Sequence, residues 1–172
     1  RFITTPIYTR LLSSEQYGVT SVYYSWESIL GVVAMLSLQY GIFNNGMYEF
    51  RKDRNTYISS ILLLSNLSTA TVFAIIFFLQ GIGLNLINLN MSLLWLMMLV
   101  FMVKPAYSFW VSQQRYEFKY KKPAIFSLIL AVSSPIAGIF LLLHAETNKA
   151  IVKLWGSYIP NIIIWFGFYC FI

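Results

Sequence analysis

The chain has 172 residues, of which 58% are hydrophobic, 18% aromatic and 10% charged, and its mean hydropathy is +0.67. Soluble domains carry about 25% charged residues, so lipid must be the solvent for much of this protein's surface. The formal net charge of +6 does not indicate nucleic-acid binding, because the basic residues are dispersed between apolar runs that a phosphate backbone cannot reach.

The apolar runs predict an all-α membrane protein with about six transmembrane helices, since a helix needs about 20 residues to cross the hydrocarbon core. In chain order the predicted spans are residues 1–9 (the end of a partial helix), 18–48, 57–80, 91–112, 124–143 and 153–172. The second span is longer than a bilayer requires, so we expect it to tilt or protrude. Pro105, Pro135 and Pro160 lie inside the last three spans, where each should kink its helix.

The stretch 104–123, KPAYSFWVSQQRYEFKYKKP, fixes the predicted orientation. Its aromatic residues are the ring types that gather where lipid tails meet headgroups, and the densest positive charge follows them, as on the cytoplasmic side of a membrane. The two predicted loops on this side carry seven basic residues, against three on the opposite side. These cytoplasmic charge anchors are Arg51, Lys52, Arg54, Arg115, Lys119, Lys121 and Lys122.

Three ionisable residues, Arg1, Glu27 and Lys104, are predicted at membrane depth, where a charge is costly and indicates function. We hypothesise that Arg1 and Lys104 line an aqueous cavity and attract the diphosphate of a lipid carrier, while Glu27 holds one of them or exchanges a proton. Two alternatives stay open. Glu27 and Lys104 could form a structural ion pair that fixes helix register, or Lys104 could reach the cytoplasmic interface.

Helical periodicity adds two asparagines to the candidates for the substrate cavity. Steps of three and four residues from Glu27 give a small or polar stripe that ends at Asn45, and we expect this stripe to face other helices or a cavity. Its members are Thr20, Tyr24, Gly31, Ala34, Leu38, Gly41 and Asn45. The opposite, lipid-facing side should hold Val22, Ile29, Leu36 and Phe43. Asn66 forms a comparable polar line on the third span with Ser59, Thr69 and Gln80.

Residues 4–26, TTPIYTRLLSSEQYGVTSVYYSW, resemble the opening of bacterial polysaccharide-unit flippases of the O-antigen and teichoic type, where a helix ends in a similar P-x-Y-T-R-L-L-S-x-x-x-Y-G run. Residues 40–49, YGIFNNGMYE, are similar to the end of the second helix in these proteins. Such flippases belong to the multidrug/oligosaccharidyl-lipid/polysaccharide exporter superfamily, whose members have two six-helix lobes around a central cavity. The resemblance implies that this chain is the amino-terminal lobe, without the second lobe and part of the first helix.

The resemblance also implies a function, the movement of an undecaprenyl-pyrophosphate-linked oligosaccharide to the outer leaflet for cell-surface polysaccharide such as lipopolysaccharide. It places the protein in the bacterial inner (cytoplasmic) membrane as a multi-pass transporter working by alternating access, with lipid-linked oligosaccharide and membrane lipids as partners. A cation-coupled drug antiporter, a peptidoglycan-precursor flippase and part of a membrane-embedded glycosyltransferase or polymerase are the alternatives. The energy source stays open, a coupling cation included.

We expect no enzymatic activity from this chain. The resemblance carries over no catalytic residue, and six acidic residues with one histidine and short loops offer little for acid–base chemistry. One cysteine and one histidine exclude the usual metal-ligand sets, so we expect no metal and no cofactor.

Overall fold

The computed structural model describes residues 4–38, 41–84 and 87–171, and the regular structure in these ranges consists of seven α-helices. The helices are α1 (Thr4–Leu11), α2 (Ser14–Ala34), α3 (Gly41–Glu49), α4 (Arg54–Gly81), α5 (Met91–Tyr116), α6 (Lys121–Leu143) and α7 (Lys149–Phe171). Four of these described helices, α4 to α7, are long and apolar enough to cross a membrane. The all-helical prediction is therefore confirmed, whereas six spans is the wrong number for the described residues.

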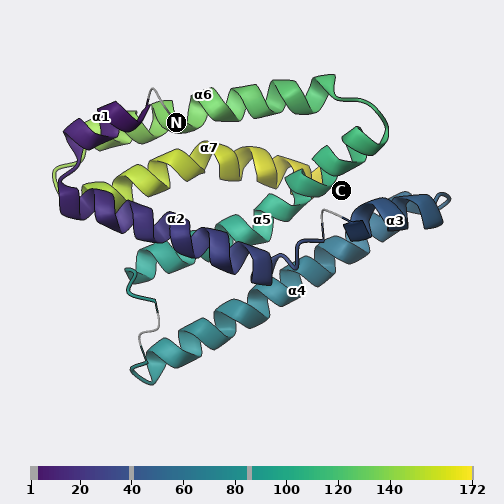
Figure 1. Ribbon diagram of the computed structural model, residues 1–172, viewed down its shortest axis with the longest axis horizontal. Helices are drawn as coiled ribbons and strands as arrows, with labels where there is room; N and C mark the ends of the chain where they lie inside the picture. The colour runs from purple at the N-terminus through teal and green to yellow at the C-terminus, as the bar shows by residue number, and fades with distance from the viewer. Residues whose placement is uncertain (1–3, 39–40, 85–86, 172) are drawn as a thin grey trace.

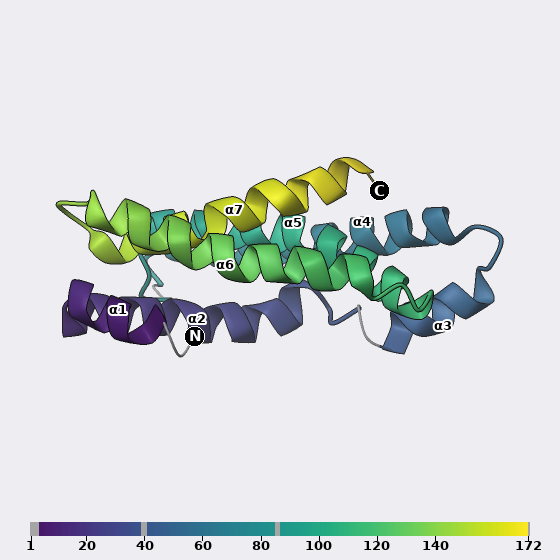
Figure 2. The same ribbon diagram turned by 90° about the horizontal axis from the view of Figure 1, so that it is seen from above.

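The four long helices form a row in the order α4, α5, α7 and α6, and neighbours in this row share the most extensive contacts (Figure 1). The three shorter helices lie along one side of the row (Figure 2). There α2 packs on α7, α4 and α5, while α1 joins α2 to α6 and α3 packs on α4 and α5. The side chains between α1–α2 and α6–α7 are therefore enclosed by two layers of helices.

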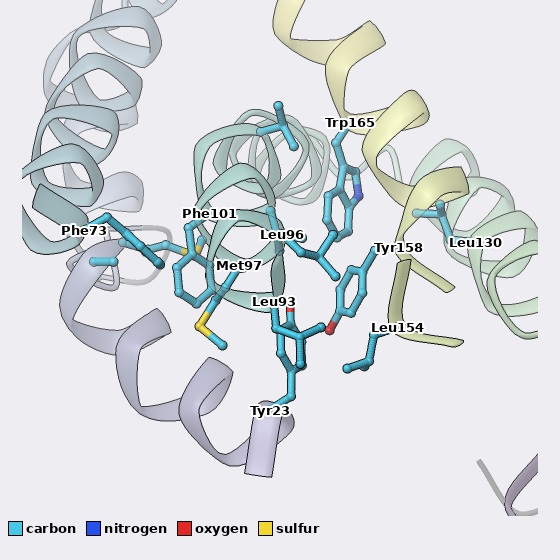
Figure 3. Close-up of a cluster of buried hydrophobic side chains, with 14 residues drawn as sticks. Tyr23, Phe73, Leu93, Leu96, Met97, Phe101, Leu130, Leu154, Tyr158 and Trp165 are labelled. Carbon is cyan, nitrogen blue, oxygen red and sulfur yellow. The ribbon is translucent and has the colours of Figure 1, made fainter. Parts of the chain in front are cut away.

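The central helix is α5, which contacts α2, α3, α4, α6 and α7. Its side chains Leu96, Met97 and Phe101 are fully buried, and Figure 3 shows them among rings from α4, α2 and α7. The ring centroids of Phe101 and Phe73 lie 6.0 Å apart in an edge-to-face arrangement. Because lipid tails are as apolar as these residues, close packing stabilises the bundle more than burial from water does.

The outward side of α6 is apolar and exposed. Leu128, Val132, Ile136 and Phe140 follow one another at four-residue spacing and are each more than half exposed. A stripe of this kind on a soluble protein would be an aggregation hazard, but it suits contact with acyl chains. The surface of α6 therefore supports the membrane location that composition predicted.

The predicted second span, residues 18–48, is not one helix. α2 ends at Ala34, and Leu36 and Ser37 adopt left-handed conformations, with φ of 51° and 47°. The Thr69 hydroxyl of α4 donates a hydrogen bond to the Ala34 carbonyl at 3.4 Å, which satisfies an acceptor left open by the end of the helix. Left-handed non-glycine residues cost about 1–2 kcal/mol each, so packing beyond the break must offset that cost.

The break changes which face of the chain is buried. Before it, Thr20 and Ala34 are buried and Ile29 is exposed, as the stripe from Glu27 predicted. After it, the prediction is wrong: Phe43 is fully buried and stacks on Phe109 with centroids 5.8 Å apart, while Asn45 is exposed. The left-handed turn rotates α3 out of the phase set by α2.

The two basic loops lie at the same end of the bundle. Arg54, at the start of α4, places its guanidinium carbon 5.2 Å from the centroid of the Tyr116 ring, at the end of α5. The remaining predicted anchors are on or beside the helix ends near this contact. α5 continues four residues beyond its predicted end and α6 begins three residues early, so the basic connection is short. Pro105, Pro135 and Pro160 all lie inside continuous helices.

A glycine contact holds α6 and α7 together. A Cβ atom on Gly156 would lie 3.1 Å from both the Ala137 carbonyl oxygen and the Gly138 Cα, so the two backbones touch where neither carries a side chain. Small residues allow such close approach between membrane helices.

We predict that Gly156→Val lowers the free energy of unfolding by about 2 kcal/mol, because two backbones must separate to admit the new side chain. The matched control is Gly167→Ala on the same helix, where an added Cβ meets no atom within 4 Å and stability should stay equal or rise slightly. Thermal unfolding of the detergent-solubilised variants measures the difference. Equal stability of the two variants would show that α6 and α7 are not in close backbone contact.

Candidate functional site

The structure brings Glu27 and Lys104 together. The Lys104 ammonium lies 3.6 Å from one oxygen of Glu27, and the Tyr158 hydroxyl donates a 2.6 Å hydrogen bond to the other. The Glu27 side chain is 15% exposed and that of Lys104 is 36% exposed. Glu27 therefore joins α2 to α5 and α7, and it has both an ionic and a hydrogen-bonding partner, as a carboxylate in a membrane bundle requires.

Beside this cluster, a polar crevice runs between α1, α2, α6 and α7. It consists of two adjoining cavities of about 210 and 160 Å³, which share Thr4, Tyr8 and Tyr24. The first is completed by Ser134, Pro135, Ser157, Tyr158 and Asn161. The second is completed by Thr5, Tyr17, Thr20, Ser21 and Lys153. Tyr158 lines the crevice and also binds Glu27, so the crevice and the ion pair form one polar system.

Lys153 is the cation of the crevice. Only 4% of the residue is exposed, and its ammonium donates to the Tyr24 hydroxyl at 3.3 Å. The ammonium also lies 4.7 Å from the centroid of the Tyr8 ring and 5.0 Å from that of Tyr24. Aromatic faces stabilise a cation through the negative potential of the ring face. Lys153 is therefore a positive charge held in a polar hollow by tyrosines of α1 and α2.

Ser134, Ser157 and Asn161 form a hydrogen-bonded seam deeper in the crevice. Ser134 Oγ donates to the Ser157 carbonyl at 2.6 Å, and the Asn161 amide donates to the same carbonyl at 3.0 Å and to Ser134 Oγ at 3.4 Å. The Tyr8 hydroxyl reaches the Pro135 carbonyl at 3.4 Å. Neutral donors and acceptors of this density suit the hydroxyl groups of a sugar.

The other predicted cavity residues are not brought to this place. Asn45 is exposed and lies on α3, whereas Glu27 lies on α2. Asn66 on α4 donates to the Tyr169 hydroxyl at 2.8 Å, which ties α4 to the end of α7. Arg1 lies outside the described residues. The structure describes four of the five candidates, and among these four only Glu27 and Lys104 contact each other.

Sequence reasoning missed Lys153, Ser157 and Asn161. The predicted last span begins at residue 153, which places the charge of Lys153 at a loop, but α7 begins at Lys149 and buries Lys153 in its second turn. The three residues are spaced by four, so they share one helical face, and this K-x₃-S-x₃-N pattern was the available signal. Thr20 and Tyr24 were on the predicted stripe and do line the crevice.

Comparison with protein-family models, with curated proteins and with solved structures finds no match for this chain. The function must therefore be inferred from the chemistry of the crevice and from the residues that form it.

We predict that Tyr158 and Lys104 contribute to the free energy of unfolding in a coupled way, because both bind Glu27. Tyr158→Phe should lower the free energy of unfolding by about 1–2 kcal/mol, because a carboxylate with little access to water loses a donor. Lys104→Met should cost less than about 1 kcal/mol, since its partly exposed side chain is screened. The double variant should depart from additivity by about 0.5–1 kcal/mol in denaturant unfolding.

A matched control is Tyr169→Phe combined with Lys104→Met. Tyr169 is another α7 tyrosine with a cross-helix hydrogen bond, but its partner is Asn66. This pair should be additive. If the Tyr158 pair is equally additive, Glu27 does not connect α7 to α5 energetically.

Proposed function

We propose that this protein moves a lipid-linked oligosaccharide across a membrane, and that the crevice between α1, α2, α6 and α7 holds the saccharide and its phosphate. The substrate class is a polyprenyl-diphosphate-linked oligosaccharide, as for undecaprenyl-pyrophosphate carriers of cell-surface polysaccharide. The protein would act as part of an alternating-access transporter in the bacterial inner membrane. Such a substrate has a saccharide, a diphosphate and an apolar tail, and each part requires a different environment. The crevice hydroxyls, Lys153 and the outer face of α6 are the counterparts that we propose.

One observation carries this proposal. The crevice residues of α1 and α2, from Thr4 to Tyr24, all belong to the stretch 4–26 that resembles polysaccharide-unit flippases. The resemblance comes from the sequence and the cavity from the packing of the helices, so neither depends on the other. Their coincidence favours sugar binding by tyrosine and threonine hydroxyls of α1 and α2.

Lys153 supplies the environment for phosphate. A diphosphate that leaves water needs charged donors, and an ammonium among hydroxyls provides them. In the hypothesis drawn from sequence, Lys104 and Arg1 had this role. Lys104 is now better assigned to holding Glu27, because the ion pair and the Tyr158 hydrogen bond occupy both carboxylate oxygens. Glu27 remains the residue most suited to exchange a proton during transport.

The apolar tail has a counterpart on the outside of α6. A shallow groove of about 860 Å³ is lined by Leu128, Val132, Ile136 and other apolar residues, together with Ser133 and Pro160. Ser133 and Pro160 adjoin Ser134 and Asn161 of the crevice in sequence, so groove and crevice lie at the same level of α6 and α7. A carrier lipid could keep its chain in the membrane while its headgroup occupies the crevice.

We predict that Lys153→Gln weakens binding of a fluorescent polyprenyl-diphosphate oligosaccharide about tenfold or more, because a buried charge-assisted contact is lost. Its matched control, Lys149→Gln, removes the same charge one turn earlier on α7 and should change the affinity less than twofold. Binding is measured in detergent micelles. Translocation is measured in vesicles that contain the protein at the length at which its cell produces it.

The outcomes separate the proposal from its competitors. Unchanged binding and flux in Lys153→Gln would remove the crevice as the substrate site. Normal binding of a polyprenyl diphosphate without sugar would restrict the site to the phosphate. Transport of a lipophilic cation in place of the saccharide would favour the drug-antiporter alternative.

A further inference from the structure

The basic end of the bundle contains a second pocket, separate from the crevice. It has a volume of about 630 Å³, opens widely to the surface, and is lined by Asn44 of α3 together with Arg115, Tyr116 and Phe118 at the end of α5. Residues 49–55 and 115–122 near it hold seven basic and three acidic side chains. The crevice residues are on other helices, so the pocket needs its own explanation.

Positive charge lies on two sides of this pocket. Arg115 is exposed and lines it directly, while the Arg54 guanidinium stacks on the Tyr116 ring at 5.2 Å. Arg54 Nε is buried and makes no hydrogen bond with any described residue, which leaves an unused donor beside the pocket wall. Guanidinium groups combine stacking on a ring with hydrogen bonding to phosphate.

The acidic residue between the pocket residues Tyr116 and Phe118 is already paired. Glu117 accepts a 2.7 Å hydrogen bond from Lys119, and this bond is the main reason that the pKa of Glu117 is below its ordinary value. Arg54 contributes to the same shift. Glu117 is thus compensated by Lys119, and the charged residue that lines the pocket is Arg115.

The surroundings place the pocket at the depth of lipid headgroups. Phe118 is 86% exposed with φ of 57°, so a left-handed turn after α5 directs a large apolar ring outward. Tyr48 and Tyr120 are 66% and 69% exposed, and Arg51 stacks over Tyr48 at 4.5 Å. Exposed rings beside cations are the pattern of the cytoplasmic membrane interface.

We propose that this pocket binds the phosphate headgroup of an anionic phospholipid of the cytoplasmic leaflet. Arg115 and the Asn44 amide donate to the phosphate, Arg54 adds positive potential from behind Tyr116, and Phe118 lies among the acyl chains. The exposed Phe118 favours a phospholipid over a free phosphate, because a soluble ion gives that ring no apolar partner. The site is independent of the proposed transport function.

The test is native mass spectrometry of the protein released from nanodiscs with equal amounts of phosphatidylglycerol and phosphatidylcholine. The wild type should retain phosphatidylglycerol preferentially, and Arg54→Gln combined with Arg115→Gln should weaken that retention roughly thirtyfold, at about 1 kcal/mol for each basic residue. Arg115→Gln alone changes an exposed side chain, so it tests the site without risk to the fold and should give part of the loss.

The matched control is Arg10→Gln combined with Lys149→Gln, which removes two positive charges at the opposite end of the bundle and should leave retention unchanged. An equal loss in the control would show a general charge effect and overturn the local site. Displacement of the lipid by millimolar glycerol phosphate or inorganic phosphate would also overturn the proposal, because the pocket would then recognise phosphate without its lipid.

Discussion

Each charged group inside this bundle needs a partner on another helix, because neither lipid nor the apolar core can supply one. Glu27 shows the constraint most clearly. Its carboxylate lies on α2 but is satisfied by Lys104 of α5 and Tyr158 of α7, so a single costly charge fixes the relative position of three helices. Where hydrophobic association is weak, such cross-helix contacts and the Gly138–Gly156 approach decide how the helices are arranged.

Much of the fold could be predicted from composition and periodicity, since long apolar runs leave few alternatives to membrane helices. α4 to α7 were all anticipated as spans, and the buried side of α2 followed from the stripe through Glu27. The break after Ala34 could not be predicted, because residues 35–40 contain neither proline nor glycine. It depends on tertiary contacts, with Thr69 bonding the last carbonyl of α2 and Phe43 stacking on Phe109.

The candidate site was predicted only in part, and the reason is the position of one helix end. Starting α7 at Lys149 instead of residue 153 moves Lys153 from the membrane surface into a buried second turn, where it meets Tyr8 and Tyr24. Residues separated by more than a hundred positions then share one hollow. Spacing within a helix can reveal a polar face, but which other polar face it meets depends on the order of helices in the bundle.

The same need for polar partners bears on the transport that we propose. In the described state the crevice groups largely bind one another: Ser134 and Asn161 share the Ser157 carbonyl, and Lys153 binds Tyr24. A saccharide phosphate that enters the crevice, as we propose, would have to replace several of these contacts at once. The Ser134 bond joins α6 to α7, whereas the Lys153–Tyr24 bond joins α7 to α2 and the bond from Tyr8 to the Pro135 carbonyl joins α1 to α6. Substrate binding would therefore loosen one layer from the other, which is the coupling between occupancy and helix movement that alternating access requires.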